Sequence, residues 1–286
     1  MRTNAIIRII LYSIAILILI SILATALLLN TFVINTDWDT VFTSENSGTV
    51  TSVGGIAADS IRDIQIEWAA GTITIMPGDV GEITFSDTAG LAEKDQMIWS
   101  QKGDKLLIQF CKPRIIFGIS IDAPKDLKII VPRGWNCDEL DIDAASADVN
   151  IQNMTIQAVD FDGASGTCTF TDCHLNILDV DTASGDINFS GTLSELDCDA
   201  ASATCTMRLT NCPKRMDADM ASGDLRLTLP ENCGFSVNLE ALSGDFTSEF
   251  PTVTKDGRYV HGDGSCVIQV SAMSGNIVIN KGSAAK

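Results

Sequence analysis

The sequence predicts an all-β protein, a parallel β-solenoid with coils of about 19 residues, preceded by one N-terminal transmembrane helix. Three observations predict this fold. A pattern centred on a serine recurs along the second half of the chain, its apolar residues alternate as they do in strands, and a long apolar run stands near the start.

The apolar run extends from Ile9 to Leu29 and is long enough, at about 1.5 Å per residue, to span roughly 30 Å of hydrocarbon as a helix. Arg2 and Arg8 precede it and acidic residues follow it, which predicts a cytoplasmic N-terminus. A cleavable signal peptide is the alternative, but the run continues to Ile34, which favours a retained anchor. We therefore expect residues 1–34 to anchor the chain in the cell membrane as a single pass, with the C-terminal domain extracellular.

The charge of the chain is strongly negative and uneven. There are 37 acidic and 19 basic residues, a net charge of −18, and the segment from Cys137 to Met207 holds fourteen acidic residues and no Lys or Arg. A nucleic-acid binder needs clustered basic residues, so this composition excludes that class. An imbalance this local indicates one acidic surface.

Two segments precede the regular repeats. Residues 35–60 are polar and rich in turn residues, which predicts a linker between membrane and folded domain. Residues 61–136 contain irregular strand patterns, from which we expect a first coil and a cap that closes the end of the solenoid.

Residues 137–286 carry the regular repeats. The copies include LDIDAASADVNI, VDFDGASGTCTF and LDVDTASGDINF, and their central serines are 19, 19, 18, 20, 21 and 31 residues apart. These serines are Ser146, Ser165, Ser184, Ser202, Ser222, Ser243 and Ser274. A weak early copy at 64–75 places Ala70 at the serine position, 76 residues before Ser146.

Each copy is predicted to be a strand, a Ser-Gly-Asp turn and a second strand. Relative to the serine, apolar residues stand at −6 and −4 and again at +3 and +5, which places them on one face, toward a core. Glycine at +1 supplies the positive φ of a sharp arc, although Ala147 and Ala203 replace it in two copies. Successive copies should stack in parallel, about 4.8 Å apart, whereas a β-sandwich of hairpins is the alternative architecture.

Positions −5 and −3 face outward in this pattern, and both are aspartate in five consecutive copies. The two predicted ladders consist of Asp141, Asp160, Asp179, Asp197 and Asp217, and of Asp143, Asp162, Asp181, Asp199 and Asp219. Stacked like charges repel, so raised pKa values, salt screening or a bound cation such as Ca²⁺ should offset the repulsion. We considered three roles for the ladders: a solubilising face, a binding site for divalent cations or cationic peptides, and catalysis by paired carboxylates.

The nine cysteines do not form a predicted disulfide framework. Cys168 and Cys205 share the +3 column but lie two coils apart, beyond disulfide reach, and Cys173 and Cys212 are separated similarly. The residue spacing contains no zinc motif, and no nucleophile or nucleotide-binding motif is found.

The Ser-Gly-Asp arcs, the IIVP segment at 129–132 and the N-terminal anchor together resemble the bacterial "putative adhesin" family of β-strand-repeat proteins, which includes LiaG-like envelope proteins. The resemblance covers roughly residues 61–280. It implies a right-handed, single-stranded β-helix in a bacterial envelope or envelope-stress context, and it supplies no catalytic residues. Cysteines in the repeats and the two glycine losses depart from the family pattern.

These observations predict a non-catalytic binding or scaffold module of the cell envelope, with an envelope protein, a glycan or a cationic peptide as its partner. One alternative is a polysaccharide-acting β-helix enzyme, but such a site needs a cation beside its acidic groups, and the acidic segment has none. The other alternative is an assembly protein whose solenoids stack end to end.

Overall fold

A computed structural model describes residues 48–111 and 124–282 of the chain. The predicted membrane anchor lies outside the described residues, as does the first part of the predicted linker. Within the described ranges, no helix has the length and apolarity needed to cross a membrane.

Strands dominate the folded unit, which starts at Gly48. Two short 3₁₀ helices accompany them, η1 (Ala58–Ser60) and η2 (Glu93–Asp95). The strands are β1 (Thr49–Val50), β2 (Val53–Ile56), β3 (Asp63–Gly78), β4 (Ile83–Asp87), β5 (Ile98–Lys102), β6 (Lys105–Gln109), β7 (Leu127–Pro132), β8 (Asn136–Gln152), β9 (Thr155–Ser165), β10 (Cys168–Ser184), β11 (Ile187–Ser202), β12 (Cys205–Leu209), β13 (Arg215–Ser222), β14 (Leu225–Pro230), β15 (Phe235–Ser243), β16 (Phe246–Ser248), β17 (Val253–Lys255), β18 (Arg258–His261), β19 (Cys266–Ser274) and β20 (Ile277–Gly282). The fold class is therefore all-β.

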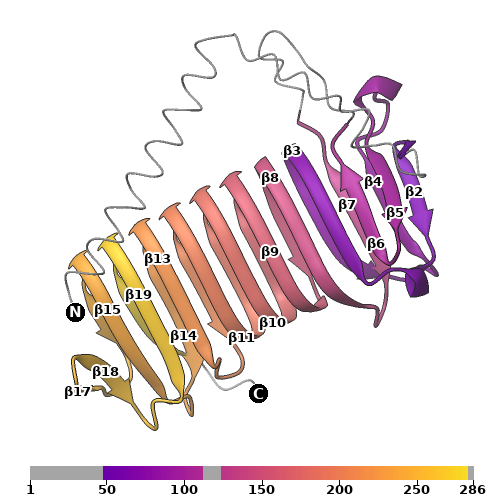
Figure 1. Cartoon of the computed structure of the whole chain (residues 1–286). Coiled ribbons are helices and arrows are strands. Elements are labelled where there is room, and N and C mark those ends of the chain that lie inside the picture. The colour runs from indigo at the N-terminus through magenta and orange to yellow at the C-terminus, as the bar shows by residue number, and fades with distance from the viewer. Residues whose placement is uncertain (1–47, 112–123, 283–286) are drawn as a thin grey trace, which may run out of the picture. The chain divides into compact units, whose positions relative to one another are not determined.

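The repeats stack in parallel and in register, as the spacing predicts (Figure 1). Ser146 pairs with Ser165, Ser184 with Ser202, and Ser202 with Ser222. The early copy also fits, because Ala70 pairs with Ser146. A sandwich of hairpins would require antiparallel pairs between copies, so that alternative is wrong.

The core is the set of inward columns that the alternation predicts. Val180 and Phe189, at −4 and +5 of one copy, are 0% and 2% exposed. The equivalent positions in neighbouring coils are also buried, among them Phe161, Phe170, Cys198 and Met207. Stacking aligns each apolar side chain with the same position in the next coil, so the core runs continuously along the repeats.

Close packing of neighbouring arcs explains the glycines at +1. Gly185 has φ +136°, and a Cβ there would lie 1.9 Å from the carbonyl oxygen of Gly166 in the preceding coil. Ala147 and Ala203 are not among the residues with positive φ, and their side chains are buried instead. The arc therefore has a second backbone form that accepts alanine.

Position +2 of the arc has a structural role that the sequence pattern did not reveal. An aspartate there accepts a hydrogen bond from the backbone N–H of the next coil: Asp148 Oδ1 from Thr167 N at 2.8 Å, and Asp186 Oδ1 from Thr204 N at 3.2 Å. Asp224 Oδ1 does the same for Asn276 N at 3.0 Å. Each such aspartate satisfies a backbone donor at the turn, where strand pairing is interrupted.

The coil order at the C-terminal end does not follow the chain. β19 pairs in parallel with β13 on one side and with β15 on the other, and β20 lies likewise between β14 and β16. The copy at 268–279 therefore stacks between the copies at 216–227 and 237–248. The expectation that these last copies simply continue the series in chain order is wrong.

Irregular strands of residues 49–132 form the N-terminal end of the stack. β3 packs in parallel against β8 on one side and against β6 and β7 on the other. β4 and β5 then add antiparallel to β7 and β6. The predicted linker is wrong over its last part, because β1 and β2 pair antiparallel with β5 and β4. The sequence of β2, VGGI, has two glycines and no clear apolar alternation, so the strand was not predicted.

The cap contains a buried ion pair. Lys125 Nζ lies 3.0 Å from Asp87 Oδ2, and the two side chains are 2% and 0% exposed. Lys125 Nζ also lies over the rings of Trp68 and Phe110, at 4.9 and 4.4 Å from their centroids. Burying this charge requires these partners, so the pair fixes the arrangement of the cap strands.

One disulfide corrects the cysteine prediction. Cys212 and Cys233 are bonded, with their Cα atoms 5.2 Å apart. They lie at corners that precede β13 and β15, 21 residues apart along the chain, outside the columns by which the cysteines were compared. The spacing of 21 residues, about one coil, between two cysteines at corners could have predicted this disulfide. Cys168, Cys173, Cys198 and Cys205 are buried free thiols, as the columns predict.

Candidate functional site

The aspartates at −5 and −3 form two continuous ladders. Asp141 pairs with Asp160 and Asp143 with Asp162, and each register continues without a shift through the next three coils. The first ladder continues with Asp179, Asp197 and Asp217, and the second with Asp181, Asp199 and Asp219. The structure thus brings together all ten predicted residues. Strand spacing places successive members about 4.8 Å apart.

The strands fix the direction of the ladders because every ladder aspartate except Asp162, which precedes the half-buried Gly163, lies between two buried neighbours. Leu178, Val180 and Thr182 point inward and are at most 8% exposed, whereas Asp179 and Asp181 between them face solvent. A shift of one residue would bury the carboxylates and expose the core, so the hydrophobic pattern fixes their direction.

Uncharged residues flank one ladder at both ends. Asp141 pairs with Gln65 at the N-terminal side, and Asp217 pairs with Gln269 at the C-terminal side. Gln269 Nε2 donates a hydrogen bond of 3.2 Å to Asp217 Oδ1. In this ladder the unbroken acidic stretch is therefore limited to five coils, whereas the other ladder continues at its N-terminal side with Glu67, the register partner of Asp143.

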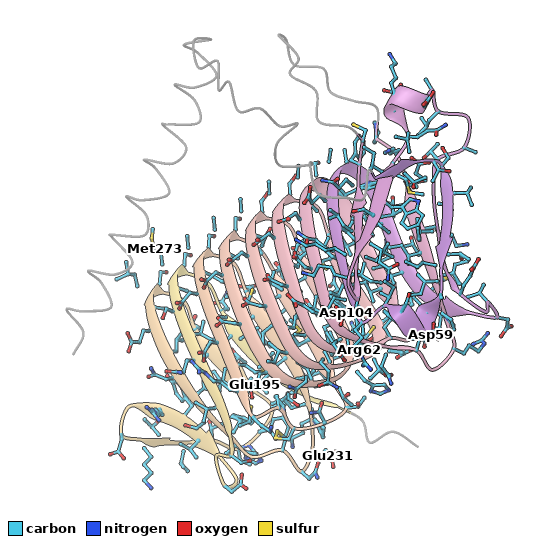
Figure 2. The ribbon with its side chains drawn as sticks, turned by 45° about the vertical axis from the view of Figure 1, so that its right-hand side comes forward. Asp59, Arg62, Asp104, Glu195, Glu231 and Met273 are labelled. Carbon is cyan, nitrogen blue, oxygen red and sulfur yellow. A yellow bond between two sulfur atoms is a disulfide. The ribbon has the colours of Figure 1, made fainter. Side chains whose placement is uncertain are left out.

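Among the described residues, basic side chains reach the ladders only near their ends. Arg215 forms an ion pair with Asp217. The charge of Lys105 partly offsets the rise in the pKa of Asp141 that desolvation and neighbouring carboxylates cause. Among the ladder aspartates, all of which lie in the described residues, only Asp217 has an ion-pair partner. The sequence pattern did not place Arg215 beside the ladders, because Arg215 follows the acidic segment in sequence. In the structure it is the register partner of Glu195, which is labelled in Figure 2.

The ladders perturb their own titration. Partial desolvation is the largest cause and neighbouring carboxylates the second, and together they raise the pKa of Asp162 and Asp179 above its ordinary value. The pKa of Asp141 and Asp197 is raised in the same way. Asp199 is the most affected: desolvation, followed by the charges of Asp219 and Asp181, raises its pKa to about 6. Of the offsets expected from the sequence, raised pKa values are present.

The geometry of the ladders suits many separate contacts better than one chelating cage. Within the described residues, no three His, Cys, Asp or Glu side chains come close enough to hold one metal ion. Flat columns on a straight sheet cannot converge on a point, as the ligands of Ca²⁺ do. The arrangement can attract an extended cationic ligand, or concentrate small cations without enclosing them.

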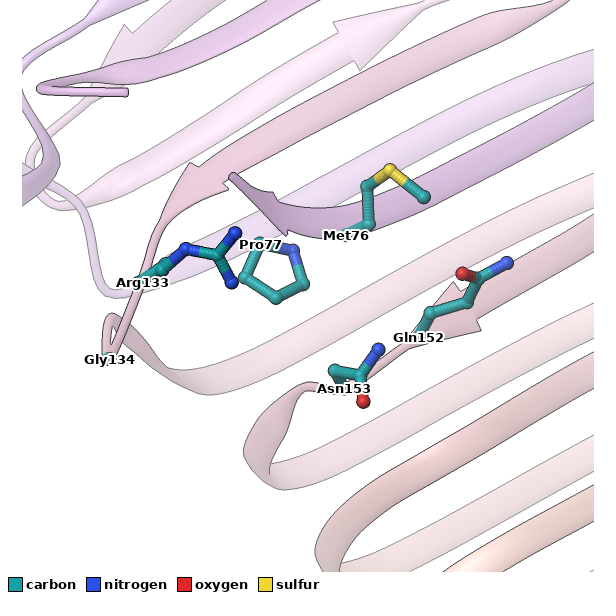
Figure 3. A pocket seen from close by; sticks show the side chains of 6 residues that line it. All are labelled: Met76, Pro77, Arg133, Gly134, Gln152 and Asn153. Atoms are coloured by element: carbon teal, nitrogen blue, oxygen red, sulfur yellow. The ribbon is translucent and has the colours of Figure 1, made fainter. Parts of the chain in front are cut away.

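Two hollows lie outside the ladders. The first, of about 420 Å³, is lined by Met76, Pro77, Arg133, Gly134, Gln152 and Asn153 (Figure 3). Its one cation, Arg133, is already paired with Asp79, Nε to Oδ1 2.6 Å. The second lies over the arcs at Gly223, Gly244 and Gly275, where Asp224 accepts hydrogen bonds from Asn276 that lower its pKa. Arg133 in the first hollow and Asp224 in the second are thus already engaged by neighbouring residues.

Both histidines have a hydrogen-bond partner at Nδ1. His174 Nδ1 lies 2.9 Å from Thr192 Oγ1, and His261 Nδ1 lies 2.8 Å from the carbonyl oxygen of Pro251. In each ring Nδ1 therefore already has a hydrogen-bond partner that is not a cysteine.

Comparison with solved structures finds weak global similarity at very low identity. A "putative cell adhesion protein" from Clostridium sporogenes is 9% identical, with a TM-score of 0.33, and the match covers 82% of this chain and 100% of that one. A "putative adhesin" from Bacteroides fragilis is 11% identical, with a TM-score of 0.41 and coverage of 82% and 98%. A "putative lipid binding protein" from Parabacteroides distasonis is 13% identical, with a TM-score of 0.36 and coverage of 81% and 96%. A search of curated proteins finds no match.

The family model for the Toastrack domain matches residues 61–280. That range contains the inner part of the cap, all the stacked repeats and both aspartate ladders. The chain belongs to the Toastrack DUF4097 family.

Proposed function

We propose that this protein is a non-catalytic binding module whose aspartate ladders bind extended cationic ligands, with cationic peptide segments of an envelope protein as the preferred class. We further propose that residues 1–34 anchor it in a bacterial cell membrane and that a right-handed β-solenoid projects outside the cell.

One observation carries the binding proposal: ten carboxylates stand in register on the strands, and in the described part of the chain only Asp217, at their end, has an ion-pair partner. The raised pKa values show that the folded chain opposes the full charge of this face. A cationic ligand removes that opposition, so binding should stabilise the fold by mass action.

A cationic peptide fits this surface better than a single chelated ion. An extended peptide places side chains at fixed intervals and can pair with several rungs at once, whereas no three ligands converge on one point in the described residues. Ca²⁺ should therefore act on the ladders as a diffuse counterion, with Mg²⁺ acting about as strongly at equal concentration.

The test measures binding of a fluorescent oligolysine peptide to the purified protein by anisotropy, at low and at physiological salt. The variant D160N/D162N/D179N/D181N removes four central charges without changing side-chain size. It should lose most of the binding, and the wild-type affinity should fall as salt increases.

The matched control removes four acidic charges elsewhere, and its substitutions are D59N, E93Q, D104N and E231Q. If the control and the ladder variant lose binding equally, net charge alone attracts the peptide and the ladders are not a site. If the wild-type protein binds no oligolysine at low salt, the ladders serve only to keep the solenoid soluble.

A further inference from the structure

The C-terminal coil occupies an interior position in the stack although it comes last in the described chain. β19 pairs with β13 from Arg215↔Val267 to Ser222↔Ser274, and with β15 from Phe235↔Cys266 to Ser243↔Ser274. β20 pairs with β14 and β16 in the same way. This coil, Cys266–Gly282, thus fills a slot whose two walls come from earlier residues.

The coil is held in the slot by strand pairing and core packing. Ile268, Val270, Ile277 and Ile279 are at most 2% exposed and complete the apolar columns. Its own cysteine, Cys266, is a buried free thiol. No covalent bond among the described residues has to break for the coil to leave.

The outer wall of the slot is attached to the body independently of the coil. The Cys212–Cys233 disulfide ends two residues before β15 begins at Phe235, and it ties that point to the corner between β12 and β13. The slot can therefore keep one wall near the other while the coil is absent.

The connection between β18 and the coil is a short hinge, Gly262–Ser265. Gly262 and Gly264 have φ +59° and +68°, in a tight turn closed by the hydrogen bond from Gly264 N to His261 O at 3.1 Å. Glycine accepts an extended conformation as readily as this one, so the hinge can open without a steric penalty.

We propose that Cys266–Gly282 is an exchangeable coil, and that a second copy of this chain is its partner: each copy inserts its coil into the slot of the other. The same sequence enters the same walls, so every hydrogen bond and buried side chain within the slot is retained. Only the hinge changes conformation, and the swapped pair is a closed dimer.

The experiment uses two full-length chains with different affinity tags, produced in the same cells. One carries Asp217→Cys and the other Gln269→Cys, because Gln269 Nε2 and Asp217 Oδ1 lie 3.2 Å apart across the β13–β19 pair. Under mild oxidation, a disulfide between the two tagged chains should form readily where the coil of one copy occupies the slot of the other.

The matched control places Asp160→Cys on one chain and Asp179→Cys on the other. These residues are also register partners on exposed neighbouring coils, but their coils follow each other along the chain without an interior insertion. We expect the cross-linked heterodimer for the D217C and Q269C chains and at least tenfold less for the control pair. Equal yields would mean random collision, and no heterodimer in either pair would mean no exchange; both overturn the proposal.

A second measurement uses the hinge itself. Deletion of Asp263 and Gly264 leaves too little chain for the coil to fold back into its own slot, so the dimer fraction in size-exclusion chromatography with light scattering should rise. A variant that stays folded by circular dichroism and remains wholly monomeric would contradict exchange.

Discussion

Replacing Asp199 by Asn should stabilise the protein at neutral pH and reduce the dependence of its stability on pH. Asp199 has an ordinary pKa of 3.8 when the chain is unfolded and a pKa of about 6 in the folded state, because of desolvation and the charges of Asp219 and Asp181. Between these two values the folded state binds more protons than the unfolded state, so the free energy of unfolding falls as pH rises through this window. Above a pH of about 6 the whole penalty is present.

The magnitude follows from the size of the pKa shift. About two pH units correspond to roughly 3 kcal/mol at most, at about 1.4 kcal/mol per unit. The Asp199 side chain is exposed, so water and salt screen the repulsion, and we expect about 1 kcal/mol instead. For a domain of this size, that corresponds to an increase in Tm of about 2–4 °C.

The assay is thermal unfolding of the wild-type and D199N proteins, followed by circular dichroism at several pH values between about 4 and 7. The wild-type midpoint should rise as pH falls through this range, and D199N should start higher and rise less. The control E231Q also removes one negative charge, but in the turn after β14 and outside the ladders. If D199N and E231Q shift the midpoint equally, or if D199N lowers it at neutral pH, the ladders do not strain the fold.

Three further predictions concern the topology, the core and the disulfide. Protease added to intact protoplasts should remove residues 35–286 and leave residues 1–8 protected; complete protection would reverse the proposed orientation. Val180→Asp or Phe189→Asp should each cost more than about 4 kcal/mol in unfolding free energy by placing an unpaired carboxylate in the core, whereas Asn188→Asp, at the outward position, should stay within about 1 kcal/mol; equal damage would contradict the observed alternation. Cys212→Ser combined with Cys233→Ser should lower stability by about 3 kcal/mol, the value for a loop of about 20 residues, and should abolish the effect of a reducing agent on Tm; a reducing-agent effect that persists in this variant would place the relevant disulfide elsewhere.

The fold of the repeats was predictable because two independent periodicities agree. The spacing of the serines fixes which residues stack, and the alternation around each serine fixes which side chains enter the core. Asp160 and Asp179 could therefore be placed in one ladder without coordinates, and the structure confirms that register. The local pattern determines the ladders because strand pairing carries it from coil to coil.

The cap was less predictable because its contacts join residues with no common pattern. Lys125 looks like a surface residue in sequence, yet it is buried against Asp87, 38 residues away. The Cys212–Cys233 bond was missed for a related reason: both residues lie at corners, where the repeat pattern no longer constrains position. Pairs of residues that are distant in sequence and lie outside the repeat columns can be identified only from a structure.

The order of the last coils shows what a repeat pattern cannot specify. Copies with the same alternation present equivalent strand edges for hydrogen bonding, so any two copies can pair. Ser274 accordingly pairs with Ser222 on one side and with Ser243 on the other. Connection length then decides the order: the 31 residues from Ser243 to Ser274 exceed one coil, and β17 and β18 use part of that excess. That extra length allows the chain to turn back and fill the slot it has passed. Because edge similarity leaves the occupant of that slot unspecified, a second copy can supply the coil as well as the chain itself can.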